Sequence, residues 1–166
     1  MMRPVFLIAA LLSIASPPPG LANLPPHRYT SLVIQFVGEM DRPVAPIVIS
    51  TSPEEAEWYN QELFKEPIGV LVGIEVVPAK TLASIAELPL LNRALRRAKP
   101  TEEEPKTTPT VRFIAGSGHD YLQIMLDAQT SRKILGGIEK TVIKYPTLVN
   151  KIREVDSLLN QAAAKR

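Results

Sequence analysis

The stretch TTPTVRFIAGSGHDYLQI, residues 107–124, contains two apolar runs on either side of a short segment rich in glycine. β-Branched and aromatic residues are frequent in both runs, a composition that is typical of β-strands. Glycine adopts the positive backbone angles that tight turns require, and Ser, His and Asp commonly accompany it. The stretch therefore predicts a β-hairpin with its turn at residues 116–119.

The same turn brings together Ser117, His119 and Asp120, which are residue types that also occur in hydrolase sites. A nucleophile elbow, however, has the pattern G-x-S-x-G and leads from a strand into a helix, whereas this segment connects two strands. Adjacent residues of a strand point to opposite faces, which would separate the side chains of His119 and Asp120. We therefore interpret the segment as a turn.

Three further strands are predicted before the hairpin, at residues 31–37, 44–51 and 68–77. Pro46 cannot donate a hydrogen bond to a neighbouring strand, so it should lie at the beginning of the second of them. The third run is apolar on nearly both faces, which is typical of a central strand that is covered on both sides.

A helix is predicted to follow the second strand directly and to end near Lys65. Ser52 suits the N-cap and Pro53 the first helical position. Ser52 and Glu55 have the spacing of a capping box, and the helix dipole favours both Glu54 and Glu55 in the first turn. Capping therefore explains these two carboxylates without any acid–base chemistry.

Helices are also predicted for the regions between and after the remaining strands. Residues 79–98 have apolar residues at helical spacing, with a kink or break at Pro89. Another helix should begin at Ser131 and end before Pro146, and a last one should follow. Their apolar stripes are formed by Ile134, Leu135, Ile138 and Val142 in one helix, and by Leu148, Ile152, Val155 and Leu159 in the other.

Residues 1–22 have the organisation of a secretory signal peptide. Arg3 precedes an apolar run from Val5 to Ala15, and small residues lead to a cut after Ala22. The run is shorter than the about 20 residues that a membrane-spanning helix needs. We expect export to a periplasm or to the outside of the cell, with no membrane span after cleavage. A cut after Ala15 and an uncleaved membrane anchor are the alternatives.

The composition excludes several classes of function. The chain of 166 residues has no Cys, so it can form neither disulfides nor thiolate metal sites, and it has no thiol nucleophile. Its formal net charge of +2 gives no general reason to expect nucleic-acid binding. The two histidines, His27 and His119, lie far apart and outside any metal-ligand spacing. We expect neither a metal nor another cofactor.

From residue 44 to about residue 145, the order of elements resembles the thioredoxin-like fold, whose core is a βαβ unit followed by a ββα unit. The segment Thr51-Ser52-Pro53-Glu54 stands where thioredoxins carry Cys-Gly-Pro-Cys, at the entry of the first core strand into its helix. The segment Thr108-Pro109-Thr110-Val111, which leads to Phe113 and Gly116, is similar to the one that holds the cis-proline of the family.

The resemblance predicts an α/β fold with a thioredoxin-like mixed sheet flanked by helices. Residues 23–43 would add an N-terminal arm and an extra strand, residues 44–145 would form the thioredoxin-like domain with an exposed polar loop at residues 99–109, and residues 146–166 would add a C-terminal helix. A different mixed α/β or α+β sandwich is the alternative.

The missing cysteines exclude thiol oxidoreductase activity, because that reaction needs an attacking thiolate and a second thiol. The resemblance implies that a peptide-binding groove beside the cis-proline could remain. Trp58 lies opposite the apolar side of its helix, which Ala56, Tyr59, Leu63 and Phe64 form. An exposed Trp often anchors an interface, although another element could cover it. The predicted contact region for a partner comprises Thr51, Ser52, Glu54, Trp58, Thr108 and Pro109.

Three functional hypotheses follow. The first is an exported, non-catalytic thioredoxin-like domain that binds a protein or peptide. The second is a small exported hydrolase that uses His119 with Asp120 or Glu54. The third is a subunit of a cell-envelope assembly, whose last helix packs on a partner through Leu148, Ile152 and Leu159. A basic face formed by Arg93, Arg96 and Arg97 could also bind an anion, but acidic residues follow it closely at 102–104.

Overall fold

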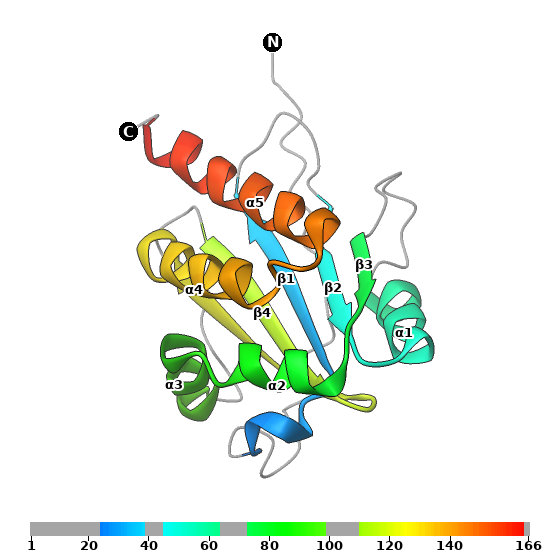
Figure 1. The fold of residues 1–166 in the computed structure, drawn as a ribbon. Coiled ribbons are helices and arrows are strands. Elements are labelled where there is room, and N and C mark those ends of the chain that lie inside the picture. Colours follow the sequence, from blue (N-terminus) through cyan, green and yellow to red (C-terminus); the bar gives the residue numbers. More distant parts are fainter. Residues whose placement is uncertain (1–23, 39–44, 64–72, 99–109, 165–166) are drawn as a thin grey trace.

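A computed structural model describes residues 24–38, 45–63, 73–98 and 110–164 (Figure 1). These residues form a mixed sheet of five strands with helices on both faces, which confirms the predicted α/β class. In chain order the elements are the short 3-10 helix η2 (Pro26–Arg28), β1 (Ser31–Val37), β2 (Ile47–Ser50), α1 (Pro53–Leu63), β3 (Gly73–Val76), α2 (Ala79–Ala86), α3 (Pro89–Arg97), β4 (Thr110–Ser117), β5 (Asp120–Asp127), α4 (Ala128–Thr141) and α5 (Pro146–Ala164).

Strand β1 lies in the middle of the sheet, whose order is β3-β2-β1-β4-β5. It is antiparallel to β2 on one side and to β4 on the other, so that Val33 is paired with both Val48 and Ile114. The hairpin of β4 and β5 is antiparallel, and β2 and β3 are parallel. The strand that the sequence set apart as an N-terminal addition is therefore the centre of the sheet, between the βαβ unit and the hairpin.

The prediction of a central strand within residues 68–77 is wrong for the part that the structure describes. Strand β3 forms one edge of the sheet, and Ile74 and Val76 on it are 36% and 42% exposed. Helix α5 packs against the other face of β3, where a Cβ at Gly73 would meet the side chain of Lys151. An apolar run indicates partial burial, but it does not say whether a second strand lies beyond it.

The helices are distributed unequally over the two faces of the sheet. Helices α2, α3, α4 and α5 cover one face and enclose the main core, and Figure 1 shows α4 and α5 in front of the strands. Helix α1 packs on the other face, where a small cluster is formed by Val33, Val48, Ala56, Tyr59 and Ile114. The apolar stripes predicted for α4 and α5 are buried, as expected.

Most predicted boundaries are confirmed. Strand β2 begins directly after Pro46, the helical region at residues 79–98 is divided at Pro89, and Pro146 separates α4 from α5. The hairpin turn contains Gly118 with a φ of 63°, a backbone angle that favours glycine. The prediction that a helix begins at Ser131 is wrong, because α4 already starts at Ala128.

The earlier start of α4 results from its N-cap, Asp127. The backbone N–H of Thr130 donates to the Asp127 carboxylate at 2.9 Å, and the Thr130 hydroxyl donates to its second oxygen at 2.8 Å. The Thr130 backbone N–H, and to a lesser extent the hydroxyl, hold the pKa of Asp127 below its ordinary value, although partial desolvation opposes them. The ionised form of Asp127 is therefore the form that stabilises the helix.

We expect Asp127→Ala to lower the free energy of unfolding by about 1 kcal/mol at pH 7, the usual loss for a removed N-cap. Because the pKa is depressed in the folded chain, this stabilisation is complete well above about pH 3.9, the value of an unfolded Asp, and is lost as the pH falls through the folded pKa. Urea unfolding of both proteins at pH 7 and below pH 3 measures the difference. An equal difference at both pH values would contradict the capping role.

Helix α1 approaches the sheet closely at Gly116 of β4. A Cβ at this position would overlap the hydroxyl of Tyr59 and would lie 2.5 Å from the hydroxyl oxygen of Ser31. Tyr59 and Ser31 are both completely buried. Burial raises the pKa of the Tyr59 hydroxyl, which therefore stays protonated. The absence of a side chain at Gly116 thus allows α1 to pack on the sheet.

We expect Gly116→Ala to destabilise the chain by about 1–3 kcal/mol, the usual range for overpacking in a core. Gly136→Ala is the matched control. A Cβ there meets nothing within 4 Å, and Ala replaces Gly inside a helix, so this change should stabilise by about 0.5–1 kcal/mol. Tyr59→Phe removes the overlapping oxygen and should partly rescue Gly116→Ala. Equal effects of the two glycine changes in urea unfolding would rule out the packing argument.

Candidate functional site at the hairpin tip

Thr30, immediately before β1, connects the hairpin to the start of α1 through its backbone. Its N–H donates to the carbonyl of Gly116 at 2.8 Å, and its carbonyl accepts a bond from the N–H of Thr51 at 2.9 Å. The Ser50 hydroxyl donates to the same carbonyl at 3.3 Å. The junction of β2 and α1 and the end of β4 are therefore both attached to one residue.

The side chain of Thr30 extends this connection to the turn itself. Its hydroxyl donates to the carboxylate of Glu55 at 2.7 Å and accepts a bond from the N–H of Gly118 at 3.0 Å. One hydroxyl can donate one bond and accept others, so the two contacts are compatible. The first turn of α1 and the tip of the hairpin are thereby held at a fixed separation.

The predicted capping box forms only in part. The hydroxyl of Ser52 accepts a bond from the N–H of Glu55 at 3.1 Å, as expected for an N-cap. The Glu55 carboxylate does not complete the box, because it accepts the bond from Thr30. The N–H of Ser52 donates instead to the Ser50 hydroxyl at 3.2 Å. Glu55 is buried, and its charge lies where the helix dipole is favourable.

Three side chains of α1 and the hairpin form an aromatic cluster, which consists of Trp58, His119 and Tyr121. The indole of Trp58 stacks on the imidazole of His119 with ring centroids 4.7 Å apart and planes 12° apart. Tyr121 is tilted against the same indole at 6.4 Å. The buried ring of Tyr59 meets it edge-on at 4.9 Å. The cluster thus joins the helix to the hairpin tip.

The aromatic cluster is accessible from solvent. Trp58 and Tyr121 are half-buried and His119 is exposed. Both earlier expectations for Trp58 therefore hold in part: it is a surface aromatic residue, and His119 covers one of its faces. An aromatic pair that is already stacked loses little side-chain freedom when a ligand contacts it.

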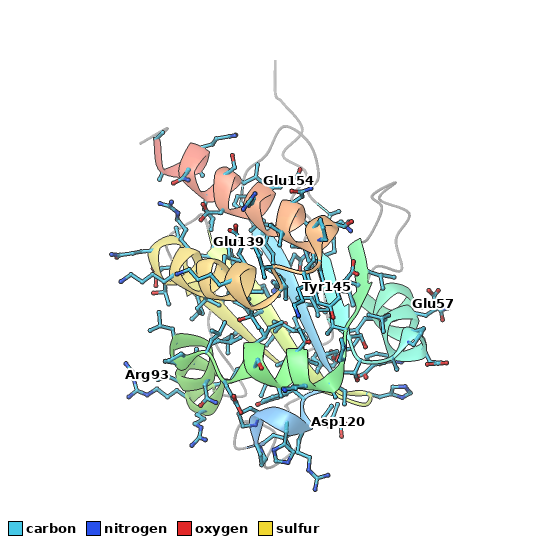
Figure 2. The ribbon with its side chains drawn as sticks, viewed as in Figure 1. Glu57, Arg93, Asp120, Glu139, Tyr145 and Glu154 are labelled. Carbon is cyan, nitrogen blue, oxygen red and sulfur yellow. The ribbon has the colours of Figure 1, made fainter. Side chains whose placement is uncertain are left out.

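Among the described residues, acidic side chains stand close to the aromatic cluster in the sequence. Glu54 and Glu57 on α1 and Asp120 at the start of β5 are exposed, and Figure 2 shows Glu57 on the outer side of its helix and Asp120 at the hairpin. Helix α1, with the sequence PEEAEWYNQEL, contains no basic residue. A positively charged group would therefore be attracted to this surface.

The structure describes four of the six predicted contact residues. Thr51 and Ser52 are half-buried at the junction of β2 and α1, and Glu54 is exposed one turn before Trp58. Thr108 and Pro109 lie outside the described residues. Sequence reasoning missed Thr30 and Tyr121, and it considered His119 only as a catalytic residue. The available signal for Thr30 and Tyr121 was their position near the ends of predicted strands.

The hydrolase hypothesis required His119 to form a hydrogen bond with Asp120 or Glu54. Within the described ranges, His119 makes its contact with the indole of Trp58, and no hydrogen bond joins it to a carboxylate. The same ranges contain no group of three His, Asp or Glu residues that could hold a metal ion. The predicted arrangement for acid–base chemistry is therefore not assembled there.

The envelope-assembly hypothesis required the apolar stripe of α5 to be available to a partner. Leu148, Ile152 and Leu159 are at most 1% exposed, because they pack in the main core of this chain. That surface is therefore not free, and this form of the hypothesis is wrong. In the part of the chain that the structure describes, no helix has the length and apolar character to cross a membrane.

Comparison with protein-family models, with curated proteins and with solved structures gives no match for this chain.

Trp58 is the single Trp of the chain, so its fluorescence reports on the aromatic cluster alone. We expect His119→Ala to shift the Trp58 emission to longer wavelength, because removal of the stacked imidazole exposes the indole to water. His27→Ala, which changes the other histidine of the chain, should leave the spectrum unchanged. An unchanged spectrum in His119→Ala would contradict the stacking.

Proposed function

We propose that this chain is an exported, non-catalytic domain that binds a protein or peptide through the aromatic cluster of Trp58, His119 and Tyr121. The observation that carries the proposal is the stacking of Trp58 on His119 at an accessible position. Aromatic residues held in place at a surface are frequent hot spots of interfaces, since little conformational entropy remains to be lost on binding.

The hydrogen bonds of Thr30 support this proposal, because they hold the two halves of the aromatic cluster together before any ligand arrives. Thr51, Ser52 and Glu54 lie at the junction of β2 and α1, just before Trp58, and would form one side of the contact surface. Thr108 and Pro109 belong to the proposed surface on the basis of sequence resemblance alone.

The charge around the aromatic cluster favours a partner with basic side chains. Arg and Lys can place their cationic groups on an aromatic face and pair with carboxylates at the same time. Exposed Glu54, Glu57 and Asp120 supply those carboxylates. The preferred ligand is therefore a segment that contains Arg or Lys, and the absence of a thiol in the chain supports binding without redox chemistry.

The thioredoxin-like assignment is part of the proposal and rests on the order of elements. From β2 to α4 that order is strand, helix, strand, two helices, hairpin and helix. The insertion of β1 between β2 and β4 departs from a core in which the βαβ and ββα units adjoin. Export is likewise proposed from residues 1–22, which lie outside the described residues.

A displayed peptide library provides the test. We expect the selected peptides to be rich in Arg or Lys and to change the Trp58 fluorescence on titration. In calorimetry, Trp58→Ala and His119→Ala should each weaken binding by about tenfold or more, because hot-spot truncations usually cost more than about 1.4 kcal/mol.

Ile143→Ala is the control variant, since Ile143 is 61% exposed and lies between α4 and α5. It should bind the selected peptides as the unchanged chain does. Full affinity in both Trp58→Ala and His119→Ala would reject the proposed surface. Selected peptides that bind there but lack basic residues would reject only the preference for Arg and Lys.

A further inference from the structure

A second surface feature is a groove of about 520 Å³ beside the end of α2 and along α3. It is lined by Glu87, Pro89, Asn92, Arg93, Arg96 and Arg97. Both helices belong to the face of the sheet opposite to α1, so the groove is separate from the aromatic cluster. Figure 2 shows Arg93 extending outward from α3.

The arginines are exposed because of the amphipathic pattern of α3. Leu91 and Leu95 are buried in the main core, which directs positions 93, 96 and 97 to the solvent. Residues three or four apart are neighbours on a helix, so Arg93 stands one turn from both Arg96 and Arg97 and repels them. The helix dipole favours cations in the last turn, which accounts for Arg96 and Arg97 but not for Arg93.

None of the ion pairs that the described residues form neutralises this group. These pairs join Arg132 to Asp156 at 3.0 Å and Arg153 to Glu139 at 2.7 Å, both on α4 and α5. The carboxylate in the groove, Glu87, is exposed at the end of α2 and forms no ion pair with an arginine within the described ranges.

The positive charge continues beyond α3 to the residues before β1. The short helix η2 carries Arg28 in its last turn. Tyr29, which follows η2, lines the same small cavity as Leu91 and Leu95 of α3, so this segment lies beside that helix. A further arginine, Arg28, therefore lies on a segment next to the helix that lines the groove.

We propose that this groove binds a phosphate group, carried either by a soluble phosphate ester or by the headgroup of an anionic phospholipid. Guanidinium groups match the oxygens of phosphate through paired N–H donors, and several of them around one anion relieve their mutual repulsion. Leu90 is 36% exposed on the same helix and would contact the apolar part of either ligand.

Two probes distinguish the two sources of phosphate. Pyrophosphate titrated into the full chain in calorimetry represents soluble esters, and sedimentation with phosphatidylglycerol vesicles, compared with phosphatidylcholine vesicles, represents the lipid. Binding of either probe by the unchanged chain is expected, and the probe that binds identifies the source. Failure of both probes to bind at low ionic strength would overturn the proposal.

The decisive comparison uses two double variants, each of which removes two positive charges. Arg93→Gln with Arg97→Gln should weaken binding about tenfold or more, because two charge-assisted contacts are lost. Arg132→Gln with Arg153→Gln removes two arginines that already have acidic partners and should bind nearly as the unchanged chain does. Equal losses in the two variants would show attraction by net charge only and would reject the groove.

A conservative variant tests the geometry. Arg93→Lys with Arg97→Lys keeps the charge but removes the paired donors, so an intermediate affinity is expected. Thermal unfolding of each variant shows whether it is folded. We expect every variant to fold, because the substituted side chains are exposed. Affinity in the Lys variant equal to that of the unchanged chain would reject recognition by the guanidinium fork.

Discussion

The hydrogen bonds of Thr30 connect the three parts of the chain that form the candidate site. Through its backbone this residue is bound to Gly116 and Thr51, and through its hydroxyl to Glu55 and Gly118. The partners lie up to 88 positions away in the sequence. Glu55 and Gly116 are buried, so a broken bond between either of them and Thr30 would leave a polar atom unsatisfied. The relative position of α1 and the hairpin tip therefore depends on this residue.

The central position of β1 explains why Thr30 can have this role. A strand that pairs on both sides places the residue before it next to both neighbours, here β2 and β4. Gly116, opposite Ser31, leaves the space into which the Tyr59 hydroxyl fits. Helix α1 is thereby brought close enough to the sheet for Trp58 to reach the hairpin. The stacking with His119 is a consequence of strand order and of one missing side chain.

The two proposed surfaces differ in chemistry and lie on opposite faces of the sheet. The aromatic cluster is bordered by carboxylates, whereas α3 presents guanidinium groups. The sequence as a whole has a formal net charge of only +2, so composition alone conceals this separation. A chain with separated charges can bind a basic segment and an acidic group independently, since charges more than about 10 Å apart are largely screened at physiological salt.

The sequence by itself determined the positions of most elements, the breaks at Pro89 and Pro146, the Ser52 cap and the buried stripes of α4 and α5. These features are local, because caps and periodicity depend on residues within about one turn of each other. The absence of Cys likewise excluded thiol chemistry without any structure. Only the tertiary structure decided that β1 is central, that β3 is an edge and that His119 meets Trp58. Alternation along a strand indicates which side chains are buried, but many strand orders satisfy the same alternation, and contacts between distant residues follow from the order that forms.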